Sequence, residues 1–333
     1  MKFLFFYSRL SLGGVETFIV RLSNWLIENG NQVCLVLIEA SELDSQLHED
    51  VQVFYFQTIL RTFSPILHSS IRNALSPEID AVCAFDPESF AMAAKTCHAL
   101  SINKPYFYGV YHPRVLCPPW GGRWIGGVRR NLLRHYGSSS SLVFMNESCR
   151  RAQQACLGLS LAESKILPVA MPTTVPRLVR PVPRKIVSVG RLVPFKSYNL
   201  YMIDIVGQLV QKGVKNLTWH VYGDGMLRDE MQERINERGL QRNVFLHGSV
   251  PYSEFRTVVE DASVFVGMGT SLIEAGMIGV PGIPAIDSAG PMTYGYTHHL
   301  ETYDVGEHLG RPPDRSVADL IEDLFQMPEE EYK

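Results

Sequence analysis

Hydrophobic and polar positions in the first third of the chain alternate between two periods. Short apolar runs predict strands, and apolar residues recurring at helical spacing predict helices between them. The predicted strands are 2–7, 32–38, 51–56, 79–85 and 105–111, and the predicted helices are 15–28, 65–75 and 87–100. Strands separated by helices favour a parallel, doubly wound α/β sheet, which binds ligands at the carboxyl ends of its strands.

The alternation stops at a proline-rich segment and then starts again. Residues 168–183 read PVAMPTTVPRLVRPVP and contain five prolines. We predict an interdomain linker at 169–183, between an N-terminal domain of residues 1–168 and a C-terminal domain of residues 184–333. In the second half the predicted strands are 185–189, 217–222, 244–247 and 263–266, and the predicted helices are 199–212, 226–238, 253–260, 271–278 and 317–325.

Three segments that follow predicted strands of the second half carry glycine turns or cations. The run SVGRLVPFK (188–196) places Arg191 and Lys196 just beyond Gly190, and two cations at a strand end suit a diphosphate. The run YGDG (222–225) is a glycine turn. The run HGSV (247–250) has backbone groups suited to reading the edge of a base.

The run VGMGTSLIEAGMIGVPG (266–282) predicts a helix that begins at a phosphate site. Thr270 or Ser271 is expected to cap this helix, and its first N–H groups then favour a phosphate. Glu274 lies about one turn further on and is suited to accept hydrogen bonds from sugar hydroxyls. The alternative interpretation is a capped helix whose glutamate only complements the helix dipole.

In this order, these segments resemble the GT-B glycosyltransferases of family 4, which are retaining and depend on nucleotide sugars. The resemblance rests on SVGRLVPFKSYNL, HVYGDGMLRDEM, VFLHGSVPYSEF and ASVFVGMGTSLIEAGMIGVP, and GGVET (13–17) also fits. It is strong over residues 185–285 and looser between 40 and 180. It implies two Rossmann-like domains facing across a cleft, with the acceptor bound by the N-terminal domain and the nucleotide sugar by the C-terminal domain.

The resemblance also implies roles for individual residues. Arg191 and Lys196 would neutralise the leaving diphosphate, and His112 would contact the donor sugar near the reacting carbon. Glu274 would bind the ribose. The other implied donor-binding positions are Gly13, Gly14, Gly190, Gly223, Gly248, Val250, Gly269, Thr270 and Ser271. The donor would be UDP-linked or GDP-linked, and no cofactor or metal is implied, because the arginine and lysine do the work of a divalent ion.

Two departures from the family pattern keep other functions open. The family's first glutamate lies eight positions before its second, and here that position is Val266. A catalytically silent subunit that binds a nucleotide or a partner is therefore an alternative. The family's C-terminal crossover helix is also expected to be short or missing. An NAD-dependent oxidoreductase is less favoured, because no G-x-G-x-x-G opens a helix after a strand.

Charge and cysteine content add expectations about location. The net charge is −3, but residues 1–180 carry +4 and residues 181–333 carry −7. The segment 118–136, PPWGGRWIGGVRRNLLRHY, mixes tryptophans and arginines, which suits either an anionic membrane surface or a core helix with snorkelling arginines. We expect a lipid-linked or polysaccharide-precursor acceptor, no nucleic-acid partner, and a cytoplasmic protein, peripheral on the inner membrane face.

Six cysteines at positions 34, 83, 97, 117, 149 and 156 show no C-x-x-C spacing. We expect them to be small buried apolar residues in a reducing compartment, with neither a zinc site nor a redox pair.

Overall fold

The fold is taken from a computed structural model, which describes residues 1–55, 79–99, 101–102, 106–117, 139–171, 174–300 and 303–328. Contacts divide the chain into two compact units, Met1–Ala170 and Met171–Lys333, and the boundary falls inside the segment 169–183. The predicted helix at 65–75 and the basic segment 118–136 lie outside the described residues.

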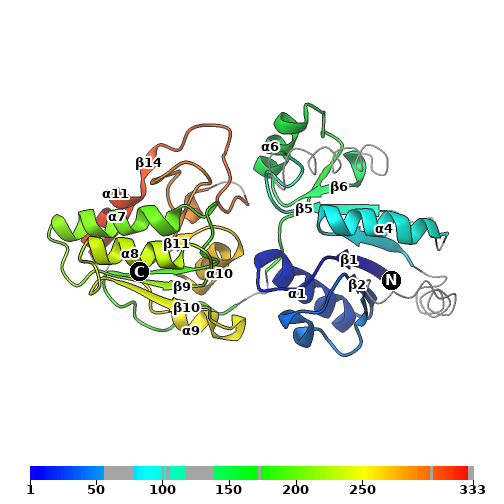
Figure 1. Ribbon diagram of the computed structural model, residues 1–333, viewed down its shortest axis with the longest axis horizontal. Helices are drawn as coiled ribbons and strands as arrows, with labels where there is room; N and C mark the ends of the chain where they lie inside the picture. Colours follow the sequence, from blue (N-terminus) through cyan, green and yellow to red (C-terminus); the bar gives the residue numbers. More distant parts are fainter. Residues whose placement is uncertain are drawn as a thin grey trace. The chain divides into compact units, whose positions relative to one another are not determined.

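The first unit is built on a seven-stranded parallel sheet with the strand order β3-β2-β1-β4-β5-β6-β7 (Figure 1). Its strands are β1 (Lys2–Tyr7), β2 (Gln32–Leu37), β3 (Gln52–Tyr55), β4 (Ala81–Ala84), β5 (Tyr106–Val110), β6 (Leu142–Phe144) and β7 (Lys165–Ile166). Its helices are α1 (Gly14–Glu28), α4 (Pro87–Ala99) and α6 (Glu147–Leu157), with short 3₁₀ turns η1 (Glu42–Gln46) and η2 (Ser139–Ser141). The prediction of β1 to β5, α1 and α4 from periodicity is confirmed.

The sequence analysis missed β6, α6 and β7. The two strands are only three and two residues long, which leaves no measurable alternation. Helix α6 is mostly polar, but its ends are well marked. The Asn146 side chain accepts a hydrogen bond from the Cys149 N–H at 2.7 Å, and Gly158 ends the helix with a φ of 62°. Asn146 and Gly158 are therefore the sequence signal that could have predicted this helix, although its apolar periodicity could not.

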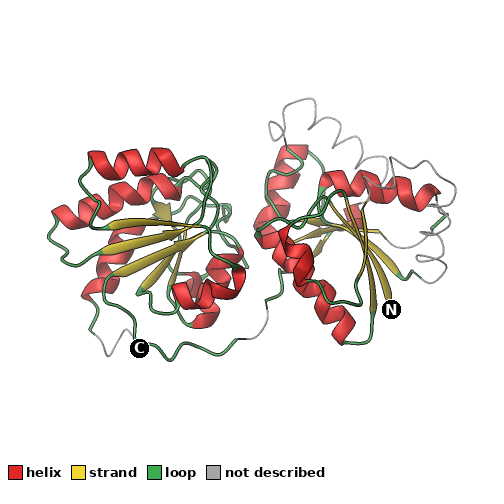
Figure 2. Ribbon diagram, turned by 60° about the horizontal axis from the view of Figure 1, so that its bottom comes forward, coloured by secondary structure: helices red, strands yellow, loops and turns green. Residues whose placement is uncertain are grey.

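The second unit is built on a five-stranded parallel sheet with the order β10-β9-β8-β11-β12. Its strands are β8 (Lys185–Val189), β9 (Thr218–Tyr222), β10 (Val244–Gly248), β11 (Val264–Gly267) and β12 (Gly282–Pro284), beside an antiparallel pair, β13 (Met292–Thr293) and β14 (Arg315–Ser316). Its helices are α7 (Tyr198–Gln211), α8 (Arg228–Glu237), α9 (Phe255–Val259), α10 (Thr270–Ile278) and α11 (Val317–Gln326), with 3₁₀ turns η3 (Tyr252–Glu254) and η4 (Thr297–His299). Helices cover both faces of each sheet (Figure 2), so the predicted doubly wound α/β class is confirmed.

The two faces of the second sheet have separate apolar cores. Ile186, Trp219 and Val266 point toward α7, α8 and α11, whereas Val187 and Phe265 point toward α9 and α10. This alternation follows from the two-residue period of a strand. Helix α11 buries its apolar stripe against α7 within this unit. The predicted shortening of a crossover helix stays a prediction.

A polar network in this core joins three neighbouring strands. The indole Nε1 of the fully buried Trp219 donates to Ser188 Oγ at 3.0 Å, and Ser188 Oγ donates to the Val266 carbonyl at 2.6 Å. Each buried polar group therefore has a partner, which avoids the cost of desolvating it alone. The network ties β9, β8 and β11 together directly beneath their carboxyl ends.

Two arginines hold the proline-rich segment against the second unit. Arg256 Nη1 donates to the Val175 carbonyl at 2.8 Å, and Arg177 Nη1 donates to the Ala262 carbonyl at 2.5 Å. The Arg177 N–H also donates to the Ile278 carbonyl at 2.6 Å, at the end of α10. These contacts order residues 174–177 although no regular element runs through them.

The expectation that all six cysteines are unpaired is wrong for two of them. Cys117 and Cys156 form a disulfide in the first unit, with their Cα atoms 5.9 Å apart. It joins the segment after β5 to the end of α6. The two cysteines are 39 residues apart, so the absence of C-x-x-C spacing gave no information about this pair. Cys34, Cys83, Cys97 and Cys149 are not in disulfides.

Candidate functional site

The strand order of the second sheet reverses at one place. Strand β8 lies between β9 and β11, and the helices that follow β8 and β11 pack on opposite faces. Helices that diverge in this way leave a crevice at the carboxyl ends of the two strands, where open α/β sheets bind ligands. The segment after β8 contains Gly190, Arg191 and Lys196, and the segment after β11 leads into α10.

Lys196 curls back over Gly190 at this strand end. A Cβ added to Gly190 would lie 2.7 Å from Lys196 Nζ, so a side chain at this position would displace the ammonium. Burial, and then the charge of Arg191, lower the pKa of Lys196 to about 8. No carboxylate of the described residues offsets these effects. A buried cation without a counter-charge is costly, and an anionic ligand would remove that cost.

The glycines after β8, β9 and β10 let three backbone segments meet. A side chain on Gly223 would collide with the Gly190 carbonyl oxygen, and the Gly223 N–H donates to the Gly248 carbonyl at 2.7 Å. Gly248 has a φ of 82°, a conformation that favours glycine. The loop that leads on to Val250 therefore starts beside the Lys196 site.

The beginning of α10 differs from the prediction in two respects. The N-cap is Gly269, with no side-chain cap, and Ser271 Oγ donates instead to the Val189 carbonyl at 3.0 Å. Neither Thr270 nor Ser271 therefore caps the helix. The Gly269 N–H donates to the Val305 carbonyl at 2.7 Å, so it does not point toward a phosphate. The N–H groups of Thr270 and Ser271 belong to the first turn of the helix, where intrahelical acceptors are missing.

Glu274 lies on α10 about one turn beyond that end and is partly buried. Its Oε1 accepts a hydrogen bond from the Tyr252 hydroxyl at 3.0 Å. Sequence reasoning missed Tyr252. The two residues are 22 positions apart, and no local pattern indicates that they meet.

Val266, at the position of the missing first glutamate, is a core residue. It lies within β11 with 0% of its surface exposed, among the side chains facing α7 and α11. The shortened segment between β11 and α10 places this position on the strand rather than in a loop. Valine at 266 is therefore explained by core packing, and a carboxylate there would be buried.

Gly13, Gly14 and His112 belong to the first unit. Gly13 is the N-cap of α1 and Gly14 its first residue; a side chain on Gly13 would collide with the Glu16 carboxylate. Glu16 Oε1 accepts a hydrogen bond from the Tyr7 hydroxyl at 3.1 Å. His112 follows β5; its Nδ1 accepts from the Arg114 N–H at 3.1 Å, and its carbonyl accepts from Gln153 Nε2 at 2.9 Å. The assignment of these three residues to a donor site stays a prediction.

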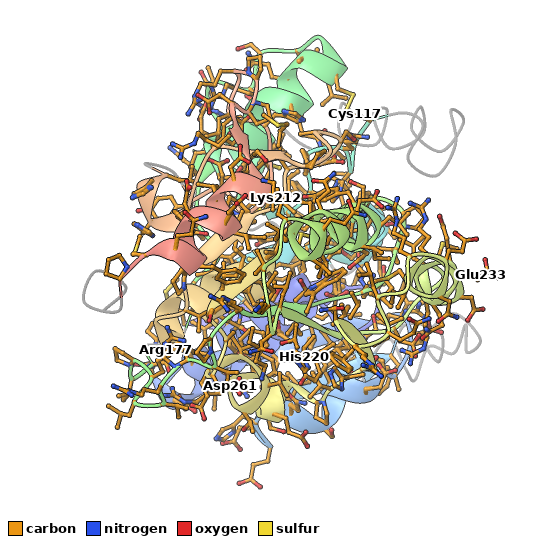
Figure 3. All side chains as sticks on the ribbon, turned by 90° about the vertical axis from the view of Figure 1, so that its left-hand side faces the viewer. Cys117, Arg177, Lys212, His220, Glu233 and Asp261 are labelled. Carbon is orange, nitrogen blue, oxygen red and sulfur yellow. A yellow bond between two sulfur atoms is a disulfide. The ribbon has the colours of Figure 1, made fainter. Side chains whose placement is uncertain are left out.

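A pair of histidines lies on the neighbouring strands β9 and β10 of the second sheet, with Lys185 and Asp261 nearby (Figure 3, where His220 and Asp261 are labelled). His220 Nδ1 and His247 Nε2 are 2.9 Å apart, so one proton is shared between them. Burial, followed by the charges of Lys185 and His247, lowers the pKa of His220 to about 4. Burial also lowers the pKa of His247.

We expect acid to destabilise the protein through this pair. The folded-state pKa of His220 lies below its unfolded value, so the unfolded chain binds more protons between the two pKa values. The stability is fully present above about pH 6.5 and is lost as the pH falls toward about 4. After discounting for the half-exposed ring, we expect a loss of about 1 kcal/mol between pH 7.5 and 5.

Urea unfolding of the wild type and of His220→Gln at these two pH values measures the effect. His220→Gln should lose less stability on acidification, whereas His98→Gln, a change at an exposed histidine of the first unit, should behave like the wild type. Equal losses in the wild type and in His220→Gln would refute the assignment.

The described residues contain neither a metal-binding cluster nor a membrane-spanning helix. No group of three histidine, cysteine, aspartate or glutamate residues there is arranged to hold a metal ion. None of the helices there is long and apolar enough to cross a bilayer.

Comparison with known proteins finds glycosyltransferases. Residues 177–333 match the family model described as glycosyl transferases group 1. The poly(ribitol-phosphate) alpha-N-acetylglucosaminyltransferase of Staphylococcus aureus (strain COL) is 32% identical over 144 residues, which cover 42% of this chain and 27% of that protein. The match thus spans about a quarter of the length of this curated relative.

Solved structures of glycosyltransferases share the fold over most of the chain. HepE of Anabaena, in complex with UDP and glucose, is 18% identical, with 86% of this chain and 80% of that chain covered and a TM-score of 0.66. A TarM variant of S. aureus in complex with UDP is 12% identical, with 98% and 92% covered and a TM-score of 0.69. The lipopolysaccharide outer core galactosyltransferase WaaB is 15% identical, with 100% and 92% covered and a TM-score of 0.62.

These matches confirm the predicted fold, because the whole chain follows that of known GT-B proteins. The family match covers almost all of the second unit, where the candidate site lies. The chain therefore has the GT-B fold, and its residues 177–333 match the model of the glycosyl transferases group 1 family.

Proposed function

We propose that this protein is a retaining glycosyltransferase that uses a nucleoside diphosphate sugar as donor. The observation that carries the proposal is the partly buried and desolvated Lys196 ammonium, which lies at the strand reversal with no carboxylate of the described residues beside it. A diphosphate supplies the missing negative charge. The first turn of α10 follows the neighbouring strand β11, and its N–H groups favour the same ligand.

The chemistry follows from this distribution of charge. The bond between the anomeric carbon and the donor phosphate oxygen breaks, and the acceptor hydroxyl oxygen bonds to that carbon while its proton passes to the departing diphosphate. Negative charge accumulates on the diphosphate, and Arg191, Lys196 and the first N–H groups of α10 stabilise it. Fixed donors of this kind contribute about 3–4 kcal/mol each to transition-state stabilisation. Our proposal includes no metal ion, since the two cations take that part.

The relatives support a surface-polymer acceptor. By their names, one acts on poly(ribitol-phosphate) and another builds the outer core of lipopolysaccharide. We propose a lipid-linked or polysaccharide-precursor glycan as acceptor here. The UDP in the HepE and TarM complexes favours UDP over GDP as the nucleotide of the donor.

A membrane surface completes the proposal. The basic, tryptophan-containing segment 118–136 would hold the protein on the anionic inner face, close to a lipid-linked acceptor. The catalytically silent alternative rested on the missing acid at position 266, and the core position of Val266 offers packing as another reason for the valine.

A thermal-shift series with UDP, GDP, ADP, CMP and NAD tests the proposal. A ligand at a hundred times its dissociation constant stabilises the folded state by about 2.7 kcal/mol. We expect one nucleoside diphosphate to raise the melting temperature of the wild type, and Glu274→Ala to remove most of that shift because the ribose loses its acceptor.

The matched control is Glu233→Ala, which removes an exposed glutamate from α8 (labelled in Figure 3). Its shift should equal that of the wild type. A shift with NAD alone, or none with any nucleotide, would overturn the proposal.

A further inference from the structure

The hydrogen bond from Tyr252 to Glu274 joins two segments that the sheet keeps apart. Tyr252 begins η3, two residues beyond Val250 in the loop that follows β10. Glu274 lies on α10, which follows β11, and strands β9 and β8 lie between β10 and β11. The 3.0 Å bond from the Tyr252 hydroxyl to Glu274 Oε1 therefore connects the loop at Gly248 to the helix that begins at the phosphate site.

We propose that Tyr252 is a positioning residue that orients the Glu274 carboxylate toward a ribose carrying both its 2′- and 3′-hydroxyls. This inference rests on the proposed function and adds Tyr252 to its ribose site. A glutamate has three rotatable side-chain bonds, and a hydrogen bond to one oxygen restricts them before the ligand arrives. A carboxylate has about four lone-pair sites, so accepting one hydrogen bond from Tyr252 is compatible with accepting two neighbouring hydroxyls as well.

The order of the subsites along the second unit agrees with this role. The loop Gly248–Val250, suited to a base, is followed directly by Tyr252, and Tyr252 contacts Glu274. Glu274 lies about one helical turn from the first N–H groups of α10, which favour phosphate. Base, ribose and phosphate follow each other in this order in a nucleotide, so the Tyr252 hydroxyl lies at the position where base and ribose meet.

A tyrosine with a purely structural bond offers the matched control. The Tyr296 hydroxyl donates to the Leu320 backbone carbonyl at 2.7 Å, where it ties η4 to α11. Tyr296→Phe and Tyr252→Phe each remove one hydroxyl, together with the hydrogen bond it donates, from the same unit. A general loss of stability would affect both variants, whereas a loss of ribose recognition would affect Tyr252→Phe alone.

The experiment is calorimetric titration of the full-length wild type and both variants with UDP, GDP, their 2′-deoxy analogues and pyrophosphate. Losing a hydrogen bond to a charged group predicts about tenfold weaker binding of the preferred ribonucleotide by Tyr252→Phe. Pyrophosphate, which has no ribose, should bind within about twofold of the wild type. The wild-type preference for the ribonucleotide over its deoxy analogue should shrink in Tyr252→Phe and persist in Tyr296→Phe.

Steady-state kinetics adds a second readout. Tyr252→Phe should raise the KM for the donor sugar and leave kcat within about twofold, because the bond acts before the chemical step. Unchanged ribonucleotide affinity in Tyr252→Phe would overturn the inference while leaving the proposed function intact. An equal loss of pyrophosphate and nucleotide affinity would also overturn it. If the wild type binds no nucleoside diphosphate at all, the proposed function fails, and this inference fails with it.

Discussion

Replacing Lys196 with methionine is expected to lower kcat/KM by about 10²–10³-fold and, at the same time, to make the ligand-free protein more stable. The first effect follows from losing a cation that stabilises the leaving diphosphate. The second follows because the ammonium is enclosed beside Gly190, with Arg191 as the neighbouring charge. Methionine has a similar length and no charge to desolvate.

The pKa of Lys196 gives the pH dependence of both effects. At a pKa of about 8 the folded protein loses this proton well before the unfolded chain, whose lysine titrates near the ordinary value of 10.5. Destabilisation of the wild type by the charge is therefore fully present below pH 8 and disappears as the pH rises toward 10.5. The stability gain of Lys196→Met should be about 1–3 kcal/mol at pH 7 and should shrink above pH 8.

Nucleotide affinity should change in the opposite direction. The diphosphate binds the protonated lysine, so the affinity of the wild type falls as the pH rises beyond about 8. Lys196→Met should bind weakly at every pH. Urea unfolding and nucleotide titration between pH 7 and 9.5 measure the two effects on the same samples.

Lys215→Met is the control, because Lys215 is exposed at the surface of the same unit. It should change neither nucleotide affinity nor the pH profile. A Lys196→Met protein that binds UDP as tightly as the wild type, or that unfolds more easily at pH 7, would contradict the assignment of Lys196 as an unneutralised cation that awaits an anion.

Restoring the family's first glutamate by Val266→Glu is expected to unfold the second unit rather than to improve catalysis. The Val266 side chain is fully buried in the core between the sheet and helices α7 and α11, and its carbonyl accepts from Ser188. A carboxylate there has no partner and no water. Burying such a group costs more than about 4 kcal/mol, which is a large part of the stability of an ordinary domain.

Val266→Ala is the reference variant, against which the loss of stability in Val266→Glu is compared. It removes two methyl groups without adding charge, and a loss of about 2–3 kcal/mol is expected for a core cavity of that size. Soluble yield and urea unfolding of both variants measure the difference, and Val266→Glu should be the more damaging by a wide margin. A soluble Val266→Glu protein with raised transfer activity would show that position 266 faces the donor after all.

Local patterns in the sequence account for most of the fold. The strand candidates at 2–7 and 185–189 and the helix candidates at 15–28 and 199–212 all appear within one or two residues of their predicted bounds. Their apolar periods were long enough to measure. Strands β6 and β7 and the polar helix α6 were missed, because short or capped elements leave little periodic signal.

The candidate site divides in the same way. Its glycine turns and cations are contiguous motifs, so Gly190, Arg191 and Lys196 could be assigned to one strand end from spacing alone. Two hydrogen bonds of the site join residues that are far apart in the chain. One runs from the Tyr252 hydroxyl to Glu274, and the other from the Gly269 N–H to the Val305 carbonyl. Such pairings depend on which strands become neighbours, and strand order is not encoded in any single window of residues.

The sequence by itself determined most of the helices and strands, the α/β fold class and the residue types at the strand ends. These features depend on periodicity, capping and turn chemistry, which act over a few neighbouring residues. Only the tertiary structure decided that Val266 is a core residue, that Cys117 pairs with Cys156, and that Lys196 is desolvated enough to lower its pKa. Burial and long-range contact are properties of the packed chain. They arise when separate strands and helices come together, and the same local sequence leaves them undetermined.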